Sequence, residues 1–123
     1  MSLLESGEMY LETILLLSKK GQPVRAVNVG EYMGYSKPSV SRAMGILKND
    51  GYITVDQSGG IVLTDSGRKV AEHIYDRHTT LTRLLVMLGV DEAIAAEDAC
   101  KMEHYLSEQT YAAFKALLNQ KKL

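Results

Sequence analysis

Two short β-type segments follow directly on a run of helical segments, and this order is the strongest constraint that the sequence places on the fold. Residues 52–55 and 61–64 are rich in β-branched and aromatic side chains, which favour strands. The residues between them, 56–60, are of the kinds that occupy tight turns. The three pieces together predict a β-hairpin.

Apolar periodicity and capping residues predict three helices ahead of this hairpin, over residues 3–19, 26–33 and about 37–49. Gly34 ends the second helix, and the third begins at the hydroxyl of Ser36 with Pro38 in its first turn. The short loop between the second and third helices has helix-turn-helix proportions. A hairpin directly after such a pair predicts a winged helix-turn-helix.

The rest of the chain predicts further helices, over about residues 65–88, 91–106 and 107–118. The expected fold class is therefore mainly α with a small β-hairpin wing. We expect a winged helix-turn-helix DNA-binding domain over residues 1–64 and an α-helical metal-binding and dimerisation domain over residues 65–123. A leucine stripe is expected both to close the core of the second domain and to bind another copy of the chain. It consists of Leu81, Leu84, Leu85 and Leu88.

Charge is segregated along the chain, although 14 Lys and Arg nearly balance 15 Asp and Glu overall. Residues 19–69 hold eight of the basic residues and four of the acidic ones. This excess predicts a basic face for an anionic partner. Winged helices also serve as protein-interaction modules, so charge, turn geometry and wing together favour double-stranded DNA.

The exposed face of the third helix is the expected reader of the major groove. Arg42 can bond a guanine edge with two hydrogen bonds, while Lys37 and the helix N-terminus can hold phosphates. Helix-turn-helix proteins usually dimerise on two half-sites, which predicts a homodimer on a palindromic operator. The residues predicted to contact DNA are Arg25, Lys37, Pro38, Ser39, Ser41, Arg42, Ser58 and Gly59.

A thiol, a carboxylate and an imidazole recur at helical spacing in the second half. Cys100, Glu103 and His104 stand at positions i, i+3 and i+4, so they share one face of a helix. Three such donors make half of a transition-metal site, and other helices must supply the rest. The further candidates are Met9 and Glu12, spaced i, i+3 on the first helix, and His78, midway along the long helix.

Four segments, in order, resemble the diphtheria toxin repressor family of iron- and manganese-dependent transcriptional repressors, in a short form without an SH3-like domain. The segments are Glu8-Met9-Tyr10-Leu11-Glu12-Thr13-Ile14, Ser36-Lys37-Pro38-Ser39-Val40-Ser41, Gly60-Ile61-Val62-Leu63-Thr64-Asp65-Ser66-Gly67 and Ala99-Cys100-Lys101-Met102-Glu103-His104-Tyr105-Leu106-Ser107. The resemblance implies metal sites between a winged helix and a dimerisation region.

The resemblance also implies a mixed set of metal ligands. The four ligands of one site in the iron-responsive branch fall on Met9, Cys100, Glu103 and His104. Glu12 and His78 match ligands of the manganese-responsive branch, whereas two ligands of the iron branch's second site fall on Thr82 and Ala96. Thioether and thiolate suit Fe²⁺ better than Mn²⁺. The expected cofactor is a divalent transition metal, Fe²⁺ first and Mn²⁺ second.

The predicted function is metal-dependent repression in metal homeostasis, in which the ion fixes the dimer geometry for operator binding. Two alternatives stay open: a regulator that senses an organic ligand or an oxidant through Cys100, and an enzyme with Cys100 and His104 as nucleophile and base. Nothing in the sequence suggests an oxyanion hole, so no enzyme and no small-molecule substrate are expected. A single cysteine fits the reducing cytoplasm, and the apolar runs, such as residues 14–17 and 84–88, are far too short to cross a membrane.

Overall fold

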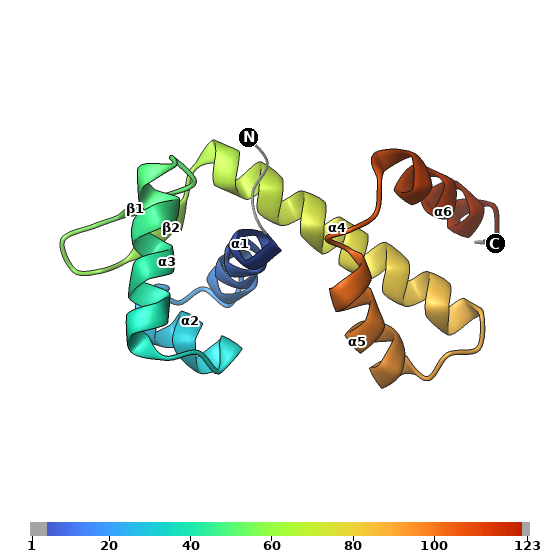
Figure 1. Ribbon diagram of the computed structural model, residues 1–123, viewed down its shortest axis with the longest axis horizontal. Coiled ribbons are helices and arrows are strands. Elements are labelled where there is room, and N and C mark those ends of the chain that lie inside the picture. Colours follow the sequence, from blue (N-terminus) through green and yellow to red (C-terminus); the bar gives the residue numbers. More distant parts are fainter. Residues whose placement is uncertain (1–4, 122–123) are drawn as a thin grey trace. The chain divides into compact units, whose positions relative to one another are not determined.

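The computed structural model describes residues 5–121 and divides into two compact units, Met1–Glu72 (unit 1) and His73–Leu123 (unit 2). The elements run in the order α1 (Glu5–Ser18), α2 (Ala26–Met33), α3 (Lys37–Asn49), β1 (Ile53–Val55), β2 (Ile61–Leu63), α4 (Asp65–Met87), α5 (Glu92–Met102) and α6 (Glu108–Lys121) (Figure 1). This order confirms the predicted fold class. Leu3 and Leu4, where the first helix was expected to begin, lie outside the described residues.

Unit 1 is built around one apolar core to which every element contributes. Leu11 and Ile14 of α1 are fully buried, and Val40 of α3 packs in the same cluster. The strands β1 and β2 pair antiparallel, with Ile53 opposite Leu63. The first turns of α4 complete the core through Ala71. In Figure 1 the loop that joins the strands extends beyond α3 as a wing.

Local caps fix the start of α3 and the start of α4. The side chain of Ser36 accepts a hydrogen bond from the Ser39 N–H at 3.3 Å, as expected of an N-cap. Gly34 ends α2 with φ of 73°, a left-handed conformation that favours glycine. Thr64 Oγ1 accepts a hydrogen bond from the Gly67 N–H at 3.1 Å. A Cβ at Gly67 would lie 2.0 Å from the carbonyl oxygen of Tyr52, so only glycine fits there.

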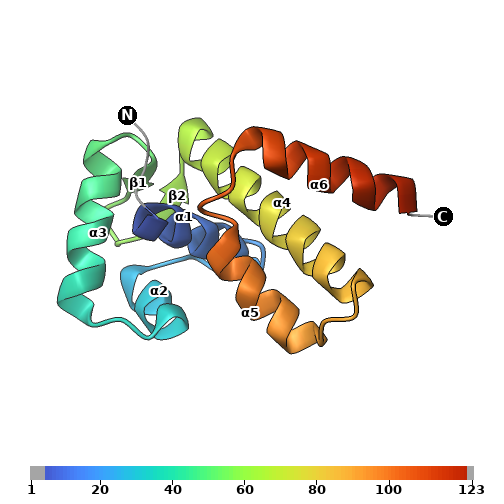
Figure 2. The same ribbon diagram turned by 45° about the vertical axis from the view of Figure 1, so that its right-hand side comes forward.

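In unit 2, α5 and α6 flank α4 (Figure 2). The leucine stripe is divided as expected: Leu81 and Leu84 are buried, while Leu88 is 69% exposed. The fifth helix ends at Met102, four residues before its predicted end. Beyond this end, Nη1 of Arg77 from α4 donates hydrogen bonds to the carbonyl oxygens of Glu103 and Leu106 at 3.0 and 2.8 Å. These carbonyls are thereby satisfied without another helical turn.

Within residues 5–121, no helix combines the length and the apolar composition that crossing a membrane requires.

Candidate functional site

The predicted reading helix α3 presents a polar face opposite its buried one. Val40, Met44 and Leu47 enter the core of unit 1. We call the opposite, exposed positions the reading face: Pro38, Ser41, Arg42, Gly45 and Asn49. Lys37 is also exposed. Ser39 differs, because it is half-buried and its hydroxyl and N–H both bond to Ser36 in the cap.

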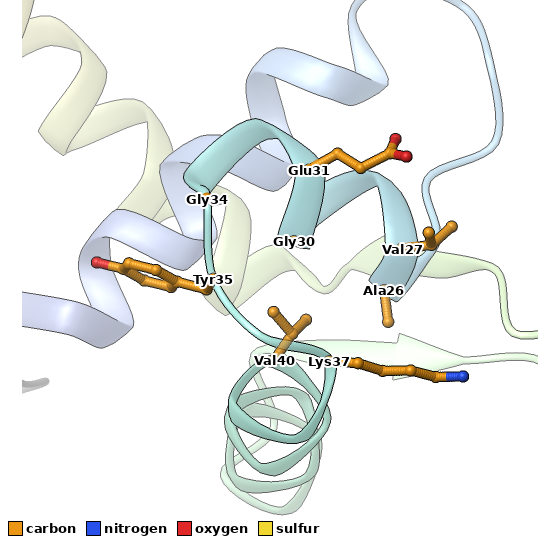
Figure 3. Close-up of a pocket in the computed structure, with 8 residues that line it drawn as sticks. All are labelled: Ala26, Val27, Gly30, Glu31, Gly34, Tyr35, Lys37 and Val40. Atoms are coloured by element: carbon orange, nitrogen blue, oxygen red, sulfur yellow. The ribbon is translucent and has the colours of Figure 1, made fainter.

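A shallow cavity of about 330 Å³ lies where α2 meets the start of α3 (Figure 3). Its wall is mostly apolar, and Figure 3 shows Lys37 and Tyr35 pointing to opposite sides of the connecting loop. The lysine therefore lies beside the N-terminus of α3, where the helix dipole favours an anion such as phosphate. The lining residues are Ala26, Val27, Gly30, Glu31, Gly34, Tyr35, Lys37 and Val40.

Arg25, one of the residues predicted to contact DNA, links the start of α2 to the wing. Arg25 Nη1 donates a hydrogen bond to the Ser58 carbonyl oxygen at 2.7 Å. The Asp56 carboxylate accepts hydrogen bonds from the Ser58 hydroxyl at 2.8 Å and from the N–H groups of Ser58 and Gly60 at 2.9 and 2.8 Å. The Ser58 hydroxyl and then the Gly60 N–H hold the pKa of Asp56 below its usual value. Arg25, just before α2, is thus bonded to the wing turn that contains Ser58 and Gly59.

In unit 2 three of the predicted metal ligands form a group around a buried carboxylate, which we call the Glu103 cluster: His78, Glu103 and His104. The Glu103 side chain is fully buried. Its Oε2 lies 3.0 Å from Nδ1 of His78, and its Oε1 lies 3.5 Å from Nε2 of His104. Among the described residues, Oε1 makes no hydrogen bond. Burying a carboxylate oxygen in this state is costly, and a bound cation would offset the cost.

The remaining predicted ligands come from α1 and α5. Cys100 is half-buried on α5, one helical turn before Glu103. Met9 and Glu12 are half-buried on α1 and belong to unit 1. Thr82 uses its hydroxyl locally, donating to the His78 carbonyl oxygen at 2.7 Å. Unit 2 thus brings together His78 of α4 with Glu103 and His104, which follow directly on α5, the helix that carries Cys100.

Sequence reasoning missed a second polar group in unit 2, between α4 and α6. Arg77 and His73 both contact the carboxylate of Glu108, the latter at 3.0 Å. Tyr111 and Lys115 of α6 both donate hydrogen bonds to Asp76. These partners lie more than 30 residues apart in sequence, so no local spacing signals them.

Comparison with known proteins separates the possible classes. Residues 2–61 match the family described as "Iron dependent repressor, N-terminal DNA binding domain". Residues 64–122 match the one described as "Iron dependent repressor, metal binding and dimerisation domain". The chain belongs to the iron-dependent repressor family. This result confirms the predicted family and the prediction that the chain is a transcription regulator and not an enzyme.

Relatives in this family differ in length. An HTH-type transcriptional regulator of Methanocaldococcus jannaschii is 33% identical over 120 residues, which cover 96% of each chain. The transcriptional regulator MntR of Escherichia coli is 36% identical over 112 residues, or 91% of this chain and 72% of its own. The diphtheria toxin repressor of Corynebacterium diphtheriae is 32% identical over 109 residues, 87% of this chain and 48% of its own.

Solved structures of metal-dependent regulators share the fold. A manganese-dependent transcriptional repressor in complex with manganese superposes with a TM-score of 0.85 at 28% identity, over 92% of this chain and 52% of that one. The manganese regulator SloR gives 0.81 at 26% identity, over 95% of this chain and 55% of that one. The chain is therefore a metal-dependent transcriptional repressor with a DNA-binding and a dimerisation domain. It spans about half the length of these two solved relatives.

Proposed function

We propose that this repressor is switched on by a divalent transition metal, Fe²⁺ in preference to Mn²⁺, and that it then binds a palindromic operator as a homodimer in the cytoplasm. The observation that carries the metal part is the Glu103 cluster. A fully buried carboxylate faces two imidazoles, and one of its oxygens makes no hydrogen bond among the described residues. Such a donor set fits a divalent transition metal.

The residues that would hold the ion are Met9, Glu12, His78, Cys100, Glu103 and His104. Their softest donors are the Met9 thioether and the Cys100 thiol, and these favour Fe²⁺ over Mn²⁺. Carboxylate and imidazole suit both metals, and solved relatives include a complex with manganese. We therefore place Fe²⁺ first and keep Mn²⁺ as the second candidate.

Bound metal would supply a coordination link between donors from both units, and the residues of the chain do the rest. Met9 and Glu12 belong to α1, which packs against α2 and α3 in the core of unit 1. Glu103 and His104 follow directly on α5 in unit 2. Fixing these donors fixes how the reading helices of a dimer are spaced. The gain in DNA affinity then equals the difference in metal affinity between the DNA-competent state and the other states. A coupling free energy of about 1.4 kcal/mol raises DNA affinity tenfold.

A second copy of the chain would cover the apolar end of α4. Val86, Met87 and Leu88 are 42%, 43% and 69% exposed there, and Ile94 of α5 is 53% exposed. Large side chains exposed in one region mark an interaction surface. The match of residues 64–122 to a dimerisation domain supports a homodimer. Two reading helices would then face two half-sites of one duplex.

Duplex binding under defined metal conditions tests this function. Random duplexes are first selected with the wild-type protein and Mn²⁺, and affinity is then measured anaerobically with Fe²⁺, with Mn²⁺ and with EDTA. We expect at least about tenfold tighter binding with metal. A double variant, Glu103→Ala with His104→Ala, should bind equally with and without metal. Equal wild-type affinity in metal and in EDTA would contradict the switch, and a response to peroxide in EDTA would favour oxidation of Cys100.

A further inference from the structure

Gly45 occupies an unusual position, in the interior of α3 and on its reading face. The helix runs from Lys37 to Asn49, and Gly45 is exposed. Because successive helical residues turn by about 100°, the five positions of the reading face lie within an arc of roughly 100°. Gly45 falls inside that arc, between the directions of Ser41 and Arg42.

Nothing within residues 5–121 requires glycine at this position. A Cβ built on Gly45 meets no atom within 4 Å among the described residues. The glycines inside two other helices differ. A Cβ at Gly30 of α2 would lie 3.3 Å from the Tyr35 carbonyl oxygen, and one at Gly67 of α4 would lie 2.0 Å from that of Tyr52. Packing explains those two glycines but leaves Gly45 unexplained.

Gly45 is also unfavourable for the stability of the free protein. Glycine in a helix interior lowers the folding equilibrium constant by roughly two- to fivefold relative to alanine. A position that weakens the helix and fills no internal need points to a requirement outside the chain. On the reading face of a repressor, that outside object is the DNA duplex.

The neighbouring residue indicates which part of the duplex lies there. Ile46 is 61% exposed, whereas the other exposed side chains of α3, except that of Pro38, are polar. The 5-methyl group of thymine is the apolar group that B-DNA presents in the major groove, and it projects from the base edge. Ile46 lies about 100° farther round α3 than Gly45 and about 40° beyond Arg42, at the edge of the reading face. The open Cα of Gly45 provides the space for such a methyl group, and the isoleucine provides an apolar contact on one side of it.

We propose that Gly45 is a specificity-determining residue, at which α3 lies closest to DNA and admits the 5-methyl group of a thymine against Ile46. The inference rests on the proposed function, because it requires α3 to enter the major groove. Arg42 lies about one turn earlier on the same face, so a guanine contact and a thymine contact would be neighbours in each half-site.

A paired change in protein and DNA tests this assignment. The probe is a duplex of about 30 bp selected by the wild-type protein with Mn²⁺, and a set of copies in which each thymine in turn is replaced by uracil. At one position per half-site, wild-type affinity should fall about threefold on loss of the methyl group. Gly45→Ala should lose about tenfold on the thymine duplex and recover most of that loss on the uracil duplex, where the new methyl group fills the vacated space.

Two further measurements make the outcome decisive. Gly45→Ala should raise the melting temperature by roughly 2–5 °C, so that its loss of affinity cannot come from unfolding. Arg42→Ala, the matched control, should lose the same factor on thymine and uracil duplexes. Unchanged affinity of Gly45→Ala, or an equal loss on every duplex, overturns the assignment of Gly45 alone. Failure of the wild-type protein to select any duplex overturns the proposed function and this inference with it.

Discussion

Unit 2 contains two histidine–carboxylate pairs on α4, at His73 and at His78. In each pair a ring nitrogen lies 3.0 Å from a glutamate oxygen, that of Glu108 for His73 and that of Glu103 for His78. Their surroundings differ. The Glu108 side chain is 74% exposed, and Arg77 also donates a hydrogen bond to it. The Glu103 side chain is fully buried and faces a second imidazole, that of His104.

The difference lies in what neutralises each carboxylate. The guanidinium of Arg77 is charged at every accessible pH, and its hydrogen bond lowers the pKa of Glu108. The imidazoles around Glu103 are uncharged once deprotonated, and they then present lone pairs that can bind a metal. The two pairs have the same distance, but the His73–Glu108 pair joins two helices, whereas the His78–Glu103 pair is part of a candidate metal site.

The largest effect is expected from Arg77→Met. Arg77 is buried and bonds the carbonyl oxygens of Glu103 and Leu106, so its loss leaves buried acceptors unsatisfied. We expect the free energy of unfolding to fall by about 2–4 kcal/mol, as measured by urea denaturation. The control is Arg68→Met on the same helix, because Arg68 is half-exposed and 3.9 Å from Glu72. A loss of equal size in both variants would contradict a special role for Arg77.

The next effect separates the two pairs directly. Glu103→Gln keeps the shape of the side chain but removes its charge, and we expect metal affinity to fall by about 100-fold or more. Glu108→Gln makes the same change in the exposed pair and should leave metal affinity within about twofold. Calorimetric titration with Mn²⁺, repeated anaerobically with Fe²⁺, measures both. Similar losses in the two variants would show that the pairs are not functionally distinct.

The sequence predicted what local spacing controls. The cap at Ser36 follows from a side chain three residues from the N–H that it bonds. The end of α2 follows from the left-handed conformation of Gly34, whose own N–H bonds to the Gly30 carbonyl oxygen. The spacing of Cys100, Glu103 and His104 was read as one helical face, although α5 ends at Met102. Glu103 keeps helical dihedral angles as the C-cap, so Glu103 and His104 remain neighbours.

Long-range partners could not be predicted in this way. Arg77 reaches acceptors 26 to 31 residues away, and Arg25 reaches the wing 33 residues away. A buried arginine on a helix has no sequence pattern that distinguishes it from an exposed one. For the same reason His73 was not singled out, since its partner Glu108 is 35 residues distant. Spacing alone does not assign Met9 and Glu12 to the same metal site as Glu103 and His104. That assignment came from the resemblance to a known family.

A smaller effect concerns acid stability at Asp76, beside the exposed pair. Partial burial raises the pKa of Asp76, but hydrogen bonds from Tyr111 and Lys115 outweigh it and hold the pKa below its usual value. A carboxylate with a lowered pKa stabilises the fold above its unfolded pKa of about 4, and this stability is lost as the pH falls through the folded value.

Replacing this carboxylate checks the direction of the effect. Because the Asp76 side chain is half-exposed, solvent screening limits its contribution to about 0.5 kcal/mol. Asp76→Asn should therefore be slightly less stable than the wild type at pH 7 and should approach it near pH 3, as measured by urea denaturation. A difference that grows towards low pH would reverse the assigned sign.

The smallest effect is expected from His73→Gln, which removes the imidazole of the exposed pair. His73 is 45% and Glu108 74% exposed in their side chains, and Arg77 still donates a hydrogen bond to Glu108 after the change. Exposed ion pairs contribute little to stability, so the melting temperature should move by less than about 2 °C and metal-dependent DNA binding should stay unchanged.

His78→Gln, the matched variant at the buried pair, should instead weaken metal binding about tenfold or more. If His73→Gln lost the metal response, the exposed pair would also be needed for metal binding. That outcome would contradict the functional difference between the two pairs.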